Sequence, residues 1–170
     1  PYDLKVSFKP INPDSAPNVY RRSFYTFWKR TGPTPVMMAL DASKRDVCTV
    51  RRERTDSAAQ ALIMLNGTQF IEAARATADA LIQTHGTAKP NDLIKEVFQK
   101  LTSRLPNNKE FGILENLLDE QKKYFTDEKE TEKFLKVGYY KSKSKDKKYL
   151  AAVTSLVSTL MNFDGTISKR

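Results

Sequence analysis

The stretch that decides the fold lies at residues 57–86 and reads SAAQALIMLNGTQFIEAARATADALIQTHG. Ser57 and Gln60 have the spacing of a capping box, in which each side chain binds the backbone N–H of the other residue and opens a helix. We expect Gly67 to end this first helix in the left-handed conformation. A second helix follows up to Gly86, because one apolar stripe recurs at helical spacing. The stripe consists of Phe70, Ala74, Ala78, Leu81 and Ile82.

The same periodicity continues to the end of the chain and predicts four further helices. One begins at Pro90 and is ended by Pro106, since proline favours the first helical turn and stops a helix further along. Asn107 opens the next helix, Asp127 opens a short one, and the last covers about residues 146–162. Their expected inward positions are Leu93, Ile94, Val97, Phe98, Leu101, Leu105, Phe111, Leu114, Leu117, Leu118, Phe125, Leu150, Val153, Leu156, Val157, Leu160 and Met161. The short connections predict one all-α domain, residues 1–170, of about six or seven helices.

The first 56 residues lack this regular pattern. Three prolines predict an extended lead-in over residues 1–20. The aromatic residues at 21–30 have helical spacing and predict a short helix, which the prolines at 33 and 35 end. We expect residues 36–40 to be extended and buried, and residues 41–56 to form a polar loop.

Charge is distributed unevenly along the 170 residues, whose formal net charge is +9. Residues 1–56 hold 11 Lys/Arg against 6 Asp/Glu, residues 57–138 hold 11 against 12, and residues 139–170 hold 7 against 2. Two basic ends therefore flank a neutral middle, a pattern that needs a functional interpretation. The Lys-rich segment at 141–148 is expected to be a solvated, mobile loop, because like charges repel. No apolar run approaches the roughly 18 to 20 residues of a membrane span.

One cysteine and one histidine limit the possible chemistry. A single cysteine excludes an internal disulfide framework, and a single histidine excludes the usual zinc sites, which need several Cys or His ligands. We therefore predict no metal site and no cofactor in this chain. His85 is expected in the last turn of a helix, where the helix dipole favours it. Cys48 has two interpretations: a reactive thiol beside Arg51 and Arg52, or an ordinary buried core residue.

Basic and aromatic residues are concentrated between Tyr20 and Thr55. Guanidinium groups bind phosphate or sulfate and rings stack on bases or sugars, so this composition favours an interface or an anion-binding surface. The alternative is a structural network in which the arginines bind nearby carboxylates and carbonyls. The candidate residues are Tyr20, Arg21, Arg22, Tyr25, Trp28, Lys29, Arg30, Asp41, Arg45, Arg51, Arg52 and Arg54. No catalytic residue is identified.

Several of these motifs also resemble those of one protein family. Residues 21–31 read RRSFYTFWKRT, residues 48–55 read CTVRRERT, residues 60–66 read QALIMLN and residues 70–75 read FIEAAR. Together they resemble a C-terminal domain of unknown function found in large multidomain proteins of planctomycetes and related bacteria, also described as cytochrome-c-associated. The resemblance extends from Tyr20 to Ile167.

This resemblance implies an exported, extracytoplasmic parent protein with a haem-binding domain upstream. The chain has no Cys-x-x-Cys-His motif, so any haem is expected elsewhere in that parent. The first residue is Pro1 rather than Met, and we expect the chain to be part of a longer protein.

Three functions are open at this point. The first is a non-catalytic accessory domain that packs against upstream domains of its parent. The second is a polyanion-binding module with sulfated polysaccharide as ligand; nucleic acid is disfavoured because no helix has the concentrated basic face of a groove-reading helix. The third is part of a composite active site for polysaccharide breakdown, collected around Tyr25, Asp41, Cys48, Arg51 and Arg52.

Overall fold

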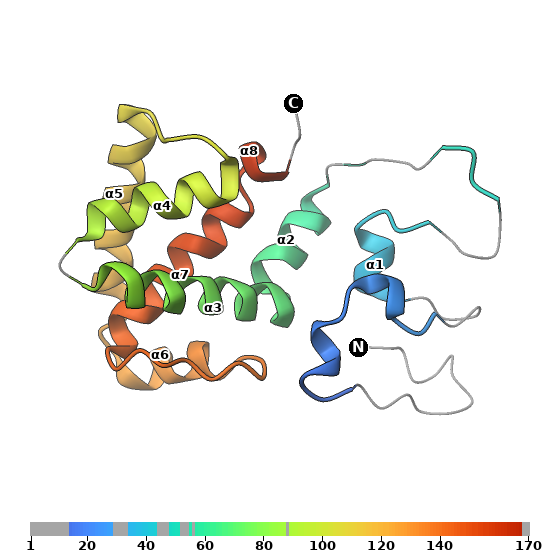
Figure 1. The fold of residues 1–170 in the computed structure, drawn as a ribbon, viewed down its shortest axis with the longest axis horizontal. Coiled ribbons are helices and arrows are strands. Elements are labelled where there is room, and N and C mark those ends of the chain that lie inside the picture. The colour runs from blue at the N-terminus through green and yellow to red at the C-terminus, as the bar shows by residue number, and fades with distance from the viewer. Residues whose placement is uncertain are drawn as a thin grey trace. The chain divides into compact units, whose positions relative to one another are not determined.

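The structure, a computed structural model, describes residues 14–28, 34–43, 48–51, 55, 57–87 and 89–167. Within these ranges every regular element is helical, so the all-α prediction is confirmed (Figure 1). Six of the eight described α-helices have eight residues or more. None of the described helices is both long and apolar enough to cross a membrane.

The chain divides into two compact units, Pro1–Ile63 and Met64–Arg170. The first contains two short 3-10 helices, η2 (Asn18–Tyr20) and η3 (Ser23–Tyr25), then α1 (Pro35–Ala39) and most of α2 (Ala58–Asn66). None of the residues in these four helices is buried, and the apolar core belongs to the second unit. The grouping of both units into one domain stays a prediction.

Two local predictions for the first unit are wrong. In the aromatic run the only regular element among the described residues is the turn η3, and Thr26 is already extended. Aromatic and β-branched residues lose side-chain freedom in a helix, so their spacing alone does not sustain one. The segment predicted as extended and buried forms α1 and is half-buried, because Pro35 at its first position has a φ suited to a helix.

The second unit is built around α7 (Lys147–Met161). Three long helices and one short one pack against it: α3 (Thr68–His85), α4 (Pro90–Thr102), α5 (Asn108–Tyr124) and α6 (Glu128–Leu135) (Figure 1). The small helix α8 (Asp164–Ile167) follows it and also contacts α4. Ten residues of α7 are buried, including Ala151 and Ala152 outside the predicted apolar stripe. A helix that is apolar on most sides is a central helix.

The predicted inward positions form the core almost throughout. Those fully inside include Ala74, Ala78, Leu81, Leu93, Ile94, Val97, Phe98, Leu118, Leu150, Val153, Leu156 and Val157. Leu105 is the exception, with 60% of its surface exposed. Helix α4 ends at Thr102 because Ser103 turns into the left-handed region, φ 62°, before Pro106 is reached.

Capping residues mark the helix ends largely as predicted. The Asn107 side chain accepts a hydrogen bond from Glu110 N at 2.8 Å, and the Glu110 carboxylate accepts one from Asn107 N at 2.8 Å. The left-handed conformation predicted for Gly67 is wrong: its φ is −67°, and it is the extended N-cap of α3. Gly86 does have a positive φ, 68°, and ends α3.

Candidate functional site

The described part of the aromatic–arginine block (residues 20–55) lies at the surface of the first unit. The exposed fractions are 57% for Tyr20, 79% for Phe24, 65% for Tyr25 and 62% for Phe27. Arg21 and Arg22 are exposed, while Trp28 is half-buried. Five further candidate residues of this block lie outside the described ranges: Lys29, Arg30, Arg45, Arg52 and Arg54.

Short turns position these rings. Tyr25 N donates to Arg22 O at 2.9 Å, and Thr26 N donates to Ser23 O at 3.1 Å. The turn brings the rings of Phe24 and Tyr25 edge to face, with centroids 5.4 Å apart. Both rings expose apolar surface close in sequence to Arg21 and Arg22.

Asp41 braces the polar loop that follows α1. Its carboxylate accepts hydrogen bonds from Thr55 N at 2.7 Å, from the Thr55 hydroxyl at 2.8 Å and from Gln60 Nε2 at 3.0 Å. Asp41 has φ 56°, a left-handed conformation that Asp tolerates better than most residues. The predicted capping box is confirmed, with Ser57 N donating to Gln60 Oε1 at 3.1 Å and Gln60 N donating to Ser57 Oγ at 3.4 Å. Asp41 thus joins the end of α1 to the beginning of α2.

The described tip of this loop is open to solvent. Cys48, Val50 and Arg51 are all exposed. The interpretation of Cys48 as a buried core residue is therefore wrong, because its side chain is exposed.

A buried polar cluster in the second unit was not predicted. Glu72, Arg75 and Asp79 lie on one side of α3 and are 7%, 1% and 0% exposed. Their partners come from the last residue of α6 and from the connection between α6 and α7, 60 or more residues later in the chain. Arg75 donates to Leu135 O and, at 2.8 Å, to Tyr140 O.

Asp79 is the centre of this cluster. One carboxylate oxygen accepts from the Tyr140 hydroxyl and from Lys143 N, both at 2.8 Å. The other accepts from Ser144 N at 2.9 Å and from the Ser144 hydroxyl at 2.5 Å. Burial alone would raise the pKa of Asp79, but the hydrogen bonds from Ser144, Lys143 and Tyr140 outweigh it and lower this pKa below its ordinary value. Each carboxylate oxygen of Asp79 thus accepts two hydrogen bonds.

Glu72 holds the beginning of the same connection. It accepts from Tyr139 N at 2.9 Å and from Tyr140 N at 2.5 Å. Gly138 precedes them with φ 84°, and a Cβ there would overlap the Glu72 carboxylate. We call residues 139–146 the lysine strap. The sequence predicts a mobile loop here; the structure attaches its backbone to α3 at four N–H groups, while its lysines are exposed as expected.

The sequence did contain a signal for this cluster. Residues 72, 75 and 79 have helical spacing, and they interrupt an otherwise apolar side of α3. Charged residues are almost never fully buried without partners, so three of them on an inward face indicate bonding to a distant segment. Their partners could not be identified from spacing, because they belong to a non-helical connection.

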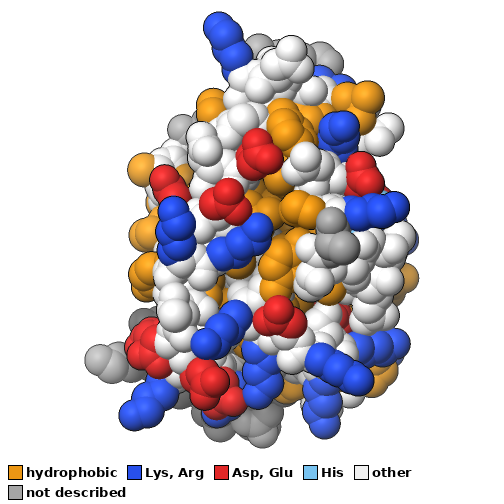
Figure 2. Space-filling view, turned by 90° about the vertical axis from the view of Figure 1, so that its left-hand side faces the viewer, with side chains coloured by type: hydrophobic (Ala, Val, Ile, Leu, Met, Phe, Trp, Pro, Cys, Tyr) orange, Lys and Arg blue, Asp and Glu red, His pale blue; other side chains and the backbone are white. Residues whose placement is uncertain are grey.

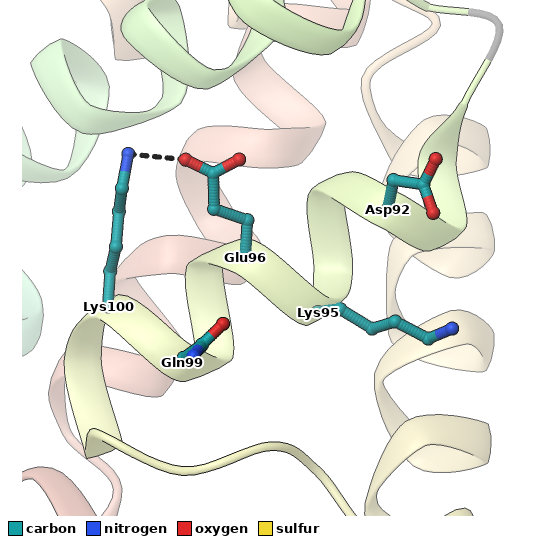
Figure 3. Close-up of a pocket in the computed structure, with 5 residues that line it drawn as sticks. All are labelled: Asp92, Lys95, Glu96, Gln99 and Lys100. Atoms are coloured by element: carbon teal, nitrogen blue, oxygen red, sulfur yellow. Dashed lines mark ion pairs between the residues drawn. The ribbon is translucent and has the colours of Figure 1, made fainter.

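A shallow depression of about 540 Å³ lies on α4. It is lined by Asp92, Lys95, Glu96, Gln99 and Lys100 (Figure 3). Lys100 faces Glu96 at 2.6 Å, and His85 at the end of α3 binds the same carboxylate. Hydrogen bonds from Lys100 and His85 lower the pKa of Glu96. Ligand pockets are usually apolar and enclosed, so this charged, open surface of one helix indicates a link between α3 and α4 rather than a ligand site.

The surface on the side of α5 carries charges of both signs. Figure 2 shows lysines and arginines interspersed with acidic residues around a band of apolar side chains. Ile113 and Tyr124 on α5 are 67% and 69% exposed. This mixed face agrees with the near-neutral charge of residues 57–138 and differs from the basic lysine strap.

Comparison with known proteins gives one match. A family described as PSD1, protein of unknown function (DUF1553), matches residues 3–118, which is more than half of the chain. No curated protein and no solved structure matches significantly.

Proposed function

Because the chain belongs to the DUF1553 family, whose function is unknown, we propose that it is a non-catalytic accessory domain that packs against other domains of a larger protein. The observation that carries this proposal is the exposed aromatic–arginine block. Four large rings and two neighbouring arginines are exposed in the first unit, within turns that bury no residue of their own. Aromatic residues and arginine are enriched in the centres of protein interfaces. Covering these rings would stabilise the contact by about 25 cal/mol per Å² of apolar surface removed from water.

The setting that we propose follows the sequence resemblance. The parent would be an exported, planctomycete-type protein that also carries a cytochrome-like domain, with this chain as its C-terminal domain. Any haem would be bound by that other domain, since this chain lacks a Cys-x-x-Cys-His motif. The upstream domains are then the partners of the aromatic–arginine block.

Hydrogen–deuterium exchange tests this proposal. The amides of residues 18–28 are compared in the 170-residue chain and in the longer parent protein. We expect slower exchange in the parent, because a covering domain excludes water from these turns. The double variant Phe24→Ser with Tyr25→Ser should restore fast exchange. The matched control, Ile113→Ser with Tyr124→Ser on α5, should leave residues 18–28 protected. Equal exchange in the short chain and the parent would overturn the proposal.

The exposed arginines favour a second candidate function, binding of a polyanion such as a sulfated polysaccharide. Arg21, Arg22 and Arg51 are exposed, and residues 1–56 carry more basic than acidic groups. The test is titration with sulfated glycans, uncharged glycans and DNA at low and moderate salt. Binding of one sulfated glycan that survives moderate salt and is lost on Arg51→Ala or Arg52→Ala supports this function. Weak binding of every polyanion that disappears with salt indicates only a general positive field.

A further inference from the structure

We propose that the lysine strap is a docking site for an acidic peptide segment of another protein. The site lies in the second unit and shares no residue with the aromatic–arginine block, so it is independent of the accessory-domain proposal. It depends on three observations. The strap has three lysines without ion pairs, its backbone is hydrogen-bonded to α3, and two of its backbone N–H groups have no hydrogen-bond partner among the described residues.

The cations are Lys141, Lys143 and Lys145. All three are exposed, and none forms an ion pair with a described residue. Lys147, directly after the strap, differs, because Glu132 on α6 binds it at 2.9 Å. Three unpaired like charges within five residues repel one another and favour a partner that neutralises them.

The buried cluster on α3 holds these lysines in place. Asp79 accepts from Lys143 N and Ser144 N, and Glu72 accepts from Tyr139 N and Tyr140 N. The lysines therefore extend from an ordered backbone. A partner that binds them pays little entropy for ordering the strap, which is the advantage of a pre-organised site.

The open main-chain groups favour a peptide. The N–H groups of Lys141 and Ser142 form no hydrogen bond with a described residue, so an extended peptide can pair with the strap while its carboxylates face the lysines. Other polyanions fit less well. The strap has no arginine fork for bidentate recognition of sulfate or phosphate, and it lacks a row of rings for stacking nucleic-acid bases.

Fluorescence anisotropy with labelled decapeptides tests the proposal in the complete 170-residue chain. The probe alternates Ser and Glu; a second probe has the same charge but carries ester bonds in place of alternate amides, which weakens the main-chain carbonyl acceptors. The variant Lys141→Gln with Lys143→Gln and Lys145→Gln removes three strap charges. The matched control, Lys109→Gln with Lys123→Gln and Lys129→Gln, removes three exposed charges elsewhere in the second unit.

We expect the Ser–Glu probe to lose affinity by about tenfold or more on the strap variant and by less than about twofold on the control. The ester probe should bind more weakly than the Ser–Glu probe to the unmodified chain. The variant Tyr140→Phe with Ser144→Ala keeps every lysine but removes two hydrogen bonds to Asp79. The backbone of the strap should then be less ordered, so the amides of residues 143 and 144 should exchange faster. The affinity for the Ser–Glu probe should fall by about threefold, because binding must now order the strap.

Four outcomes would overturn the proposal. Equal losses on the two lysine variants would reduce binding to a general field, and equal affinity for the two probes would exclude main-chain pairing. Faster amide exchange in the Tyr140→Phe with Ser144→Ala variant at unchanged affinity would refute pre-organisation. Tighter, strap-dependent binding of a sulfated glycan or a single-stranded oligonucleotide of equal charge would assign the strap to that polymer instead.

Discussion

Replacing Asp79 by alanine should be among the most destabilising substitutions in the second unit. Asp79 is 0% exposed, and its carboxylate accepts four hydrogen bonds. A bond to a charged group contributes about 1.5 to 3 kcal/mol, but the contributions do not add fully, and the donors of the strap regain some water once it loosens. We therefore expect a loss of about 3 to 5 kcal/mol in the free energy of unfolding. That loss is a large part of the 5 to 15 kcal/mol of a typical domain.

Urea unfolding followed by far-UV circular dichroism measures this loss. The matched control is Asp119→Ala, which removes an exposed carboxylate on α5 that pairs with Lys122 at 3.0 Å. Because exposed ion pairs contribute little to stability, the control substitution should lower the free energy of unfolding by less than about 1 kcal/mol. A loss for Asp79→Ala that is no larger than that of the control would refute the argument that the buried cluster holds the strap.

The same carboxylate gives a pH dependence with a defined sign. The pKa of Asp79 is lowered in the folded chain, so its stabilisation is fully present above its unfolded pKa of about 4 and is lost as the pH falls through the folded value. The advantage of the unmodified chain over Asp79→Asn should therefore shrink below about pH 4. An advantage that stays constant through acid would show that ionisation of Asp79 does not contribute.

Three further predictions concern single positions. Gly138→Ala should cost about 2 kcal/mol in urea unfolding, because φ is 84° and the added methyl group meets a buried carboxylate of α3; an unchanged midpoint would contradict this. Asp41→Ala should destabilise the first unit by about 1 to 2 kcal/mol through lost hydrogen bonds, measured by the fluorescence of Trp28, the only tryptophan; the conservative Asp41→Asn should recover part of the loss. Glu110→Gln should cost about 1 kcal/mol at neutral pH as the capping box weakens, read from thermal unfolding. A hydrogen bond from Arg104 and one from Asn107 N lower the pKa of Glu110 to about 2, so this difference should disappear as the pH falls from about 4.5 toward 2.

Local chemistry made much of the helical body predictable. The stripe from Phe70 to Ile82 and the caps at Asn107 and Asp127 depend on residues a few positions apart, which local sequence patterns detect. The end of α4 was not predictable in this way. Ser103 leaves the helix where Arg104 stacks over Phe98 at 4.8 Å and binds Glu110 of the next helix at 2.6 Å. Those side-chain contacts do not follow from the apolar spacing that placed Leu105 inside.

The candidate site residues also differ in how much of their environment could be predicted from the sequence. Exposure of Tyr20, Tyr25 and Arg21 agrees with an interaction surface that composition suggested, although which partner they contact stays a prediction. Asp41 was expected either to pair with arginines or to belong to an interaction surface, and spacing could not identify Thr55 and Gln60 as its partners. The cluster around Asp79 was not predicted, because the positive charge of the strap led to its interpretation as a solvated, mobile loop.

The central position of α7 has a consequence for the order in which the chain can fold during synthesis. Residues 147–161 leave the ribosome after all the long helices that pack against them, and α3 precedes them by more than 60 residues. Until then, the apolar faces of α3, α5 and α6 have no final partner, and the nascent chain depends on partial contacts or chaperones to avoid aggregation. The second unit therefore completes its core only when its last long helix is made, and premature termination before Lys147 should yield an aggregating product rather than a smaller folded one.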